Sequence, residues 1–496
     1  MIKNLDDEIL HLQGHDASMP RSFSSVASIG LAFSITGSWV GYLSCFGASI
    51  TFAGPQNVVL GLVVGTVVQW IITLGLAEIA SAFPSSGGQY HAVFCMASEG
   101  TRRSVSYLTG WFSMLAWWIN TSSGLMIAAK AVLGLASFCW PTYDTVNWHV
   151  YLVYLLVMLV TAAPLTMSRT VPWITQGCLY ISVSGFLMAF IVVMAMHQEF
   201  QPQGYLLHAS HGTSGWPHGF AWILGAANSM YAYVGTDGAI HIAEEMNHPG
   251  RRIPQIMNLT MLIGVLSALP LFMALIYAIQ DPEKVASATL PSLELFYQAT
   301  GSRAVSLFLQ IWVTTVYISS MTSQWVTSGR MAWAFARDGG IPFSDYFAVV
   351  DERFQSPIRA TVLSTAFASL YGLLYLASTN AFSSITTSAV LYFNISYAIP
   401  QAMALFRGRA VLPRRSLNLG PIVGPFCNAF TVIAVLALVI IYSCPSTLPT
   451  QVDSMNYSSV VLVGISGIIL ASWLLVGSRF RGPDVDLQRM HFLLSA

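Results

Sequence analysis

The sequence predicts an all-α polytopic membrane protein with twelve transmembrane helices. Of its 496 residues, 55% are hydrophobic and only 8% are charged, whereas a soluble domain carries about 25% charged residues. Twelve apolar stretches have the 18 or more residues that a helix needs to cross a bilayer. These stretches cover residues 27–48, 57–80, 106–134, 149–167, 172–196, 218–243, 257–280, 303–329, 358–378, 382–405, 421–443 and 457–477.

The lysines and arginines indicate how these spans are oriented. Cytoplasmic loops retain positive charge, and an inside N-terminus assigns 18 of the 21 basic residues to inner segments. Only Lys284 and Arg303 fall in outer loops, and Lys130 lies near the outer end of the third span, as an expected interfacial residue. We therefore predict a cytoplasmic arm at 1–26, one helical domain at 27–477 and a cytoplasmic tail at 478–496. The polar, acidic first ten residues do not predict a cleaved signal peptide.

Composition also argues against several classes of function. A net charge of zero leaves no basic face, so no nucleic-acid partner is expected. The six cysteines show no metal-binding or disulfide spacing, so we predict neither a metal site nor a cofactor. A membrane-embedded enzyme needs a nucleophile with its base or a metal constellation at depth. Of the eleven histidines, we expect only His241 to lie within the membrane, which disfavours that class.

The sixth predicted span contains a polar interruption, Gly235-Thr236-Asp237-Gly238. Each glycine weakens a helix by about 1 kcal/mol, and an aspartate at the bilayer centre costs at least ~2.5 kcal/mol. Irregular backbone at this depth is tolerated where it lines a polar cavity. We therefore predict a discontinuous sixth helix beside a solute site.

The first span is interrupted in a similar way by Ser34-Ile35-Thr36-Gly37-Ser38-Trp39, about 200 residues earlier. Two broken helices at matching positions are typical of an inverted repeat, here about 27–196 and about 218–405, followed by two further helices at about 421–477. Backbone N–H groups near Trp39 favour an anionic group, and carbonyls near Tyr233 and Val234 favour a cation. A zwitterion satisfies both ends. The alternative is that small residues only allow close helix packing.

Several motifs resemble the amino acid-polyamine-organocation (APC) superfamily, and within it the fungal amino-acid, GABA and choline permeases. The resemblance runs from Ser34 to about Arg415. It rests on Thr36–Trp39, Ala77–Pro84, Gly87–His91, Gly235–Glu245 with Pro249 and Ile253-Pro254, and Gly329–Pro342. The first break has a single glycine where many relatives have two or more.

This resemblance implies a LeuT-like fold with a five-plus-five inverted repeat and discontinuous helices 1 and 6. It also implies a secondary active permease that moves a small amine, such as an amino acid, GABA or choline, across the plasma membrane. Its expected partners are that substrate, protons as the coupling ion and the lipid bilayer. The alternatives are a transporter that imports or exports a secondary-metabolite amine or alkaloid, and a non-transporting nutrient sensor, for which both terminal arms are short.

The two breaks supply the predicted substrate-binding residues. They are Ser34, Thr36, Gly37, Ser38, Trp39, Tyr233, Gly235, Thr236, Asp237 and Gly238. Trp39 and Tyr233 are expected to offer ring faces to an ammonium group. Asp237 either pairs with the substrate, takes up the coupled proton or caps the inner half-helix.

Coupling and gating are assigned to Asp237, His241, Glu245 and Glu78. The first three follow an i, i+4, i+8 spacing, which places them on one face of an inner α-helix and predicts a proton path. Alternatively, Glu244 and Glu245 form ion pairs with Arg251 and Arg252, and Glu78 holds the inner loop by a similar pair. Sodium coupling through Ser319, Ser320 and Ser323 is the less favoured option, because hydroxyls at helix spacing usually join helices.

Overall fold

The computed structural model describes residues 2–16, 18–166, 169–207, 212–450, 455–477 and 479–485, and the described residues are helical with short connections. The first half contains α1 (Ile2–Leu12), α2 (Ser25–Thr36), α3 (Ser38–Leu43), α4 (Phe46–Ala53), α5 (Pro55–Ala82), α6 (Gln89–Met96), α7 (Arg102–Cys139), α8 (Asn147–Ala162), η1 (Ala163–Thr166), α9 (Val171–Met196) and η2 (Tyr205–Leu207). The second half contains α10 (His218–Ser229), η3 (Met230–Tyr233), η4 (Thr236–Glu245), α11 (Pro249–Tyr277), α12 (Pro282–Ser287), α13 (Pro291–Thr300), α14 (Arg303–Arg337), α15 (Ser344–Phe347), α16 (Ile358–Ala377), α17 (Thr379–Arg407), η5 (Arg409–Val411), α18 (Gly420–Ile441) and α19 (Ser458–Val476).

Eleven helical stretches among the described residues are long and apolar enough to cross a membrane. Each corresponds to one of the predicted spans. The remaining predicted span, 218–243, is divided among α10, η3 and η4, which have 12, 4 and 10 residues. The all-α membrane architecture is therefore confirmed, whereas the inverted repeat stays a prediction.

The first break lies between α2 and α3, as the sequence predicts. The Ser24 hydroxyl caps α2 by accepting a hydrogen bond from the Ala27 N–H at 3.2 Å. Helix α2 ends at Thr36, and the next residue, Gly37, is left-handed, with φ 44° and ψ 43°. A side chain at this backbone conformation costs about 1–2 kcal/mol, and glycine avoids that penalty. The chain then forms α3, which is only six residues long.

The second break lies between η3 and η4. Val234 is extended, with φ −66° and ψ 143°, and Gly235 is left-handed, with φ 74°. After the break, from Thr236 to Glu245, the chain forms a 3-10 helix rather than an α-helix, and the backbone angles of Ile242 are not helical. A Cβ at Gly235 would lie 2.8 Å from the Ile35 side chain. Glycine thus lets the two breaks pack against each other, with α2 beside η4 and α3 beside η3.

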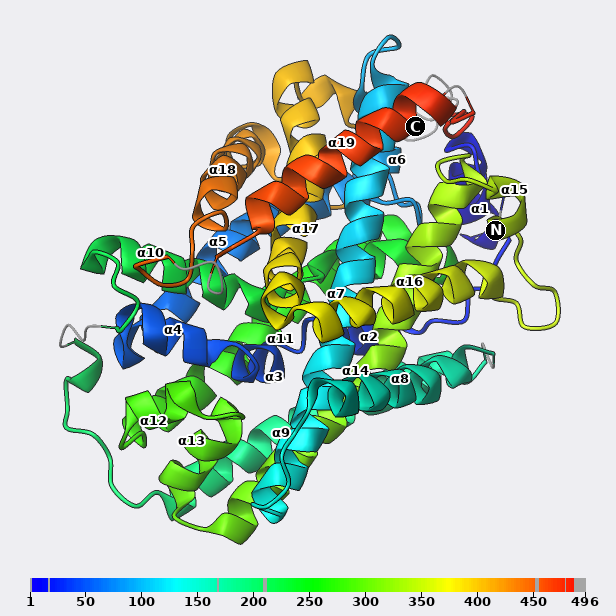
Figure 1. Ribbon diagram of the computed structural model, residues 1–496. Helices are drawn as coiled ribbons and strands as arrows, with labels where there is room; N and C mark the ends of the chain where they lie inside the picture. The colour runs from blue at the N-terminus through cyan, green and yellow to red at the C-terminus, as the bar shows by residue number, and fades with distance from the viewer. Residues whose placement is uncertain are drawn as a thin grey trace.

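The two ends of the bundle differ in their structure. Helices α1 and α15 and the C-terminal end of α19 lie at one end, here called the terminal end, while α4, α12 and α13 lie at the opposite, distal end (Figure 1). Between the ends, α8, α16 and α19 expose large apolar side chains such as Leu159, Leu370 and Leu474. Exposed apolar faces of this extent are expected where helices face lipid.

Candidate functional site

A small cavity lies beside both helix breaks and is here called the central cavity. Its volume is about 40 Å³, so it holds a few water molecules at most. It is lined by Ser34, Ile35, Thr36, Gly37, Val40 and Gly41 at the first break, Tyr231 and Val234 at the second, Asn120, Gly124 and Ile127 of α7, and Tyr317, Ser320, Met321 and Gln324 of α14. A solute at this position would touch both breaks at once.

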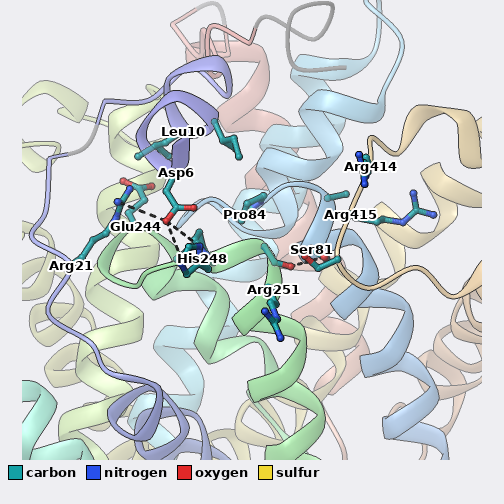
Figure 2. A pocket seen from close by; sticks show the side chains of 16 residues that line it. Asp6, Leu10, Arg21, Ser81, Pro84, Glu244, His248, Arg251, Arg414 and Arg415 are labelled. Carbon is teal, nitrogen blue, oxygen red and sulfur yellow. Dashed lines mark hydrogen bonds and ion pairs between the residues drawn. The ribbon is translucent and has the colours of Figure 1, made fainter. Parts of the chain in front are cut away.

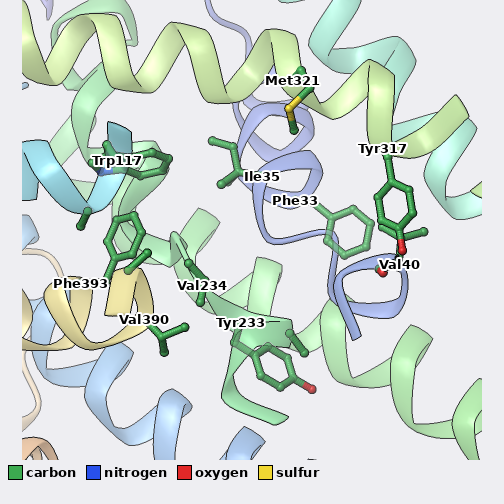
Figure 3. Close-up of a cluster of buried hydrophobic side chains, with 14 of the residues drawn as sticks. Phe33, Ile35, Val40, Trp117, Tyr233, Val234, Tyr317, Met321, Val390 and Phe393 are labelled. Carbon is green, nitrogen blue, oxygen red and sulfur yellow. Dashed lines mark hydrogen bonds between the residues drawn. The ribbon is translucent and has the colours of Figure 1, made fainter. Parts of the chain in front are cut away.

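The central cavity is polar but uncharged. None of its lining residues is acidic or basic, so a solute with a net charge would enter without a counter-ion, which is costly in a low-dielectric site. Tyr231 and Tyr317 contribute aromatic rings, which attract an ammonium group. The Tyr317 hydroxyl donates to the Val40 carbonyl at 2.6 Å and fixes that ring across the break (Figure 3). The cavity therefore suits a small solute with no net charge.

Asp237 lies outside this cavity and is fully buried. Its Oδ1 accepts a hydrogen bond from the Tyr397 hydroxyl at 2.7 Å. Its Oδ2 accepts from Gln89 Nε2 at 2.6 Å and from Trp117 Nε1 at 3.3 Å, and it lies 3.1 Å from His241 Nε2. Side chains from α6, α7, α17 and η4 thus surround one carboxylate, which explains how a charge is tolerated there.

His241 joins this cluster through both of its ring nitrogens. Its Nδ1 lies 3.0 Å from the Ser86 carbonyl oxygen, and its Nε2 lies 3.1 Å from Asp237 Oδ2. The Trp117 Nε1–H also lies 3.1 Å from His241 Nε2. A Cβ at Gly88 would lie 3.1 Å from the ring, so glycine allows the loop before α6 to cover the histidine.

Two ion pairs close the bundle on the side of this cluster that faces the terminal end. Glu245 and Arg330 form a bidentate pair at 2.8 and 3.2 Å, with both side chains buried. Glu244 and Arg337 form a second bidentate pair at 2.9 and 3.0 Å, and the guanidinium lies over the Trp333 ring. These pairs join η4 to α14, so η4 cannot move away from α14 unless they break.

The N-terminal arm covers the same end. His15 lies 3.0 Å from the Asp338 carboxylate, and the Phe23 N–H donates to the Glu245 carbonyl at 3.1 Å. Burial acts to raise the pKa of the Asp338 carboxyl, but the His15 ring and Arg337 outweigh it and hold that pKa below its usual value. The terminal end is therefore closed in this structure, by the arm as well as by the ion pairs.

A larger pocket remains at the edge of this closure. It has a volume of about 590 Å³ and lies between α1, the end of α5 and the start of α11 (Figure 2). Asp6 and Arg21 form an ion pair at 3.9 Å on its rim, and Asp6 also accepts a hydrogen bond from the His248 N–H at 3.0 Å. Its charged lining differs from the uncharged central cavity, so we do not assign it to the substrate.

Comparison with known proteins adds an independent observation. The profile of the family described as amino acid permease matches residues 23–466. The chain belongs to this family. The family is part of the APC superfamily, so the resemblance found in the motifs is confirmed.

The relatives of this permease are transporters with different stated substrates. A choline transporter of Saccharomyces cerevisiae is 29% identical over 472 residues, which cover 94% of this chain and 83% of that protein. A swainsonine transporter of Arthroderma benhamiae is 27% identical over 480 residues, covering 95% and 93%. A polyamine transporter of Saccharomyces cerevisiae is 26% identical over 486 residues, covering 95% and 78%. The family and these relatives support a multi-pass membrane permease for a small molecule rather than an enzyme.

The structure brings only part of the predicted substrate site to the cavity. Ser34, Thr36 and Gly37 line it. The other predicted members do not line it: Ser38, Trp39, Tyr233, Gly235, Thr236, Asp237 and Gly238. Trp39 is buried and donates to Ser182, and the Tyr233 hydroxyl accepts from Thr66. These two rings do not line the cavity in this state, whereas Tyr231 and Tyr317 do, so a contact of Trp39 and Tyr233 with the solute stays a prediction.

The predicted coupling residues are also separated. Asp237 and His241 meet, but Glu245 turns away to Arg330, because η4 is a kinked 3-10 helix that does not keep the i, i+4, i+8 face. Glu244 and Glu245 pair with arginines of α14, not with Arg251 and Arg252 as predicted. The capping role predicted for Asp237 is not seen either, since its partners are side chains of other elements.

Glu78 forms hydrogen bonds with residues outside the Asp237 cluster. Its carboxylate accepts hydrogen bonds from Arg409 and from Arg415 Nε, the latter at 2.9 Å. The Leu419 N–H also donates to it at 3.0 Å. Glu78 thus ties the end of α5 to the segment between α17 and α18, apart from the Asp237 cluster. This is a tether, as predicted, but to a different segment from the inner loop after the second span.

Sequence reasoning missed two residues of the Asp237 cluster and assigned the serines of α14 only as a group. Gln89 belongs to the motif Gly87–His91, but nothing in that motif indicates a contact with Asp237. Tyr397 is one tyrosine within an apolar span and carries no signal of its own. On α14, Ser320 lines the central cavity and Ser323 accepts from Ser34 at 2.7 Å, whereas Ser319 donates to its own helix at Val316.

Proposed function

We propose that this permease is a secondary active transporter for a small amine, driven by protons and working by alternating access in the plasma membrane, with both termini in the cytoplasm. The observation that carries the substrate part is the uncharged central cavity between two helix breaks, with tyrosine rings on its wall. Amino acids and GABA carry an ammonium group without a net charge, which suits this cavity once its walls move apart. The relatives named for choline and polyamines agree with an amine.

The proton part rests on hydrogen-bond donors in the Asp237 cluster. The Ser86 carbonyl can only accept, so His241 Nδ1 must carry the proton in that 3.0 Å contact. A neutral imidazole of this form has a lone pair on Nε2, which would face the Asp237 carboxylate at 3.1 Å. The Trp117 N–H can donate to that lone pair at 3.1 Å, and a proton between Nε2 and Oδ2 would join the two side chains directly. We therefore assign the coupled proton to this pair.

Losing this proton would disturb the second break. Asp237 lies two residues after Gly235, so repulsion between two acceptors would act on the start of η4. Tyr397 and Gln89 face the carboxylate as neutral donors, and Trp117 faces both members of the pair. The nearest charged groups on the same element, Glu244 and Glu245, are neutralised by Arg337 and Arg330. We therefore attribute the change of charge during coupling to the proton proposed for this pair.

The decisive experiment is uptake by purified protein in liposomes with a panel of labelled amines. We expect accumulation to rise as external pH falls from about 7 to 5, because the proton gradient grows, and to collapse when a protonophore is added. Replacing sodium by potassium should have little effect, and protein-free liposomes give the baseline. Strict sodium dependence without any effect of the protonophore would contradict the proton proposal and would turn attention to Ser320 and Ser323.

A second candidate is transport of an alkaloid or another secondary-metabolite amine. It is favoured by the swainsonine transporter that aligns with 95% of this chain. Adding swainsonine to the labelled panel separates the two candidates, because the better substrate inhibits uptake of the other at lower concentration.

A further inference from the structure

A second, larger cavity adjoins the central cavity at the distal end and is here called the distal vestibule. Its volume is about 500 Å³, which is within the usual range for small-molecule sites. It is lined by Ser44, Cys45, Gly47, Ala48, Thr51, Ser123, Met126, Ile127, Lys130, Asn228, Tyr231, Ala286, Pro291, Phe382, Val390 and Tyr442. Ile127 and Tyr231 line both cavities, so the two cavities are adjacent.

The sizes of the two cavities determine where a substrate fits first. The central cavity, at about 40 Å³, is too small for an amino acid until its walls move, whereas the vestibule already has room for one. A solute that comes from the distal end therefore meets the vestibule walls before it meets the two breaks. The side chains of the vestibule can select among solutes at that stage.

Lys130 is the one residue with a formal charge among those that line the vestibule. It lies on the face of α7 that also carries Ser123 and Ile127, because residues three and four apart share a helix face. Its Nζ lies 5.0 Å from the centre of the Tyr375 ring. No acidic residue among the described ones forms an ion pair with it. Its positive charge is therefore not neutralised by the protein.

Neither break provides a comparable positive group. Helix α3 has only six residues, so few peptide dipoles add up behind its N-terminus. The central cavity has no basic residue. Of the residues that line the two cavities, Lys130 alone can bind a carboxylate through a charge. It would also repel a solute whose only charge is positive.

We propose that Lys130 is a specificity-determining residue that docks the carboxylate of a zwitterionic substrate in the distal vestibule, so that the permease favours zwitterions over cations with the same ammonium group. This inference rests on the proposed function and narrows its substrate class. The zwitterion then passes into the uncharged central cavity without a net charge, with its ammonium group toward Tyr231 and Tyr317. A lysine that only reached the membrane surface would leave substrate preference unaffected.

The test compares glycine betaine with choline, which share a trimethylammonium group but differ in carrying a carboxylate or a hydroxyl. Uptake kinetics are measured in liposomes for the wild type, Lys130→Met, Lys130→Arg and the control Lys284→Met. Lys284 is an exposed lysine at the same end that lies outside the vestibule and pairs with Glu294. GABA and its decarboxylated counterpart propylamine provide a second matched pair.

We expect the wild type to favour the zwitterion of each pair. Lys130→Met should lower the ratio of kcat/KM for zwitterion over cation by about fivefold or more, because it removes the charge that attracts the carboxylate and repels the cation. Lys130→Arg and Lys284→Met should leave the ratio within about twofold of the wild type, and high salt should reduce the effect of Lys130 because it screens the charge.

Three results would overturn the proposal. One is a wild type that favours the cations. Another is a ratio that Lys130→Met leaves unchanged, including the case in which both substrates lose the same factor. The third is no saturable uptake of any amine by folded wild-type protein, which would overturn the proposed function as well. The first two leave the proposed function intact, so the two failures are distinguishable.

Discussion

Replacing Asp237 with asparagine tests the proton pair directly, because asparagine keeps the shape of the side chain and cannot ionise. The amide nitrogen would take the Oδ1 position, where only the Tyr397 hydroxyl must turn to accept from it. The amide oxygen would then stay at the Oδ2 position and keep the donors Gln89 and Trp117. In the opposite orientation the amide nitrogen would lie at the Oδ2 position, where it could not accept hydrogen bonds from Gln89 and Trp117.

The expected loss of stability follows from this geometry. Hydrogen bonds to a charged group contribute about 1.5–3 kcal/mol each, and neutral ones about 0.5–1.5 kcal/mol. Since most of the bonds survive in weaker form, we expect a loss of roughly 1–3 kcal/mol. Thermal unfolding in detergent measures this loss, with Glu294→Gln, a carboxylate paired at the distal end, as the matched control.

The expected effect on transport separates the possible roles of Asp237. Because the carboxylate lies outside the central cavity, the variant should bind substrate within about threefold of the wild type. It should lose accumulation against a gradient and the pH dependence of uptake, and it should keep exchange. A tenfold loss of affinity, about 1.4 kcal/mol, with coupling intact would refute this reasoning and would show that Asp237 pairs with the substrate. Unchanged binding, accumulation and pH profile would also refute it.

Two further substitutions test the first break and the closed end. Gly37→Leu should abolish saturable uptake while the protein still reaches the membrane, because a leucine both fills the central cavity and strains a left-handed residue. The control Gly37→Ala, which mainly adds strain, should keep measurable uptake. Near-normal uptake by the leucine variant would show that the first break is not part of the site. Arg330→Met should lower the free energy of unfolding by about 3–5 kcal/mol, because it leaves the buried Glu245 carboxylate without its partner. Adding Glu245→Gln to this variant should restore at least half of the loss, as measured by thermal unfolding. An Arg330→Met variant as stable as the wild type would contradict a closing role for the pair.

The sequence by itself determined the spans and the positions of both breaks. Hydrocarbon thickness demands about 20 apolar residues per helix, so span length is visible without any tertiary contact. Gly37 and Gly235 were also predictable, because only glycine adopts left-handed backbone easily. The family membership came from local motifs in the same way. All of these are properties of short stretches of chain.

Only the tertiary structure decided which side chains reach the cavity and which pair with each other. Glu245 and Arg330 are 85 residues apart, and Asp237 and Tyr397 are 160 apart, so no local spacing indicates these contacts. The 3-10 geometry of η4 rotated Glu245 away from Asp237 and His241, which an α-helical periodicity could not anticipate. Gln89, the first residue of α6, donates a hydrogen bond to Asp237, and this carboxylate does not line the central cavity. The direction in which a side chain points from a helix depends on the neighbouring helices that pack against it. The sequence of the break does not specify those neighbours.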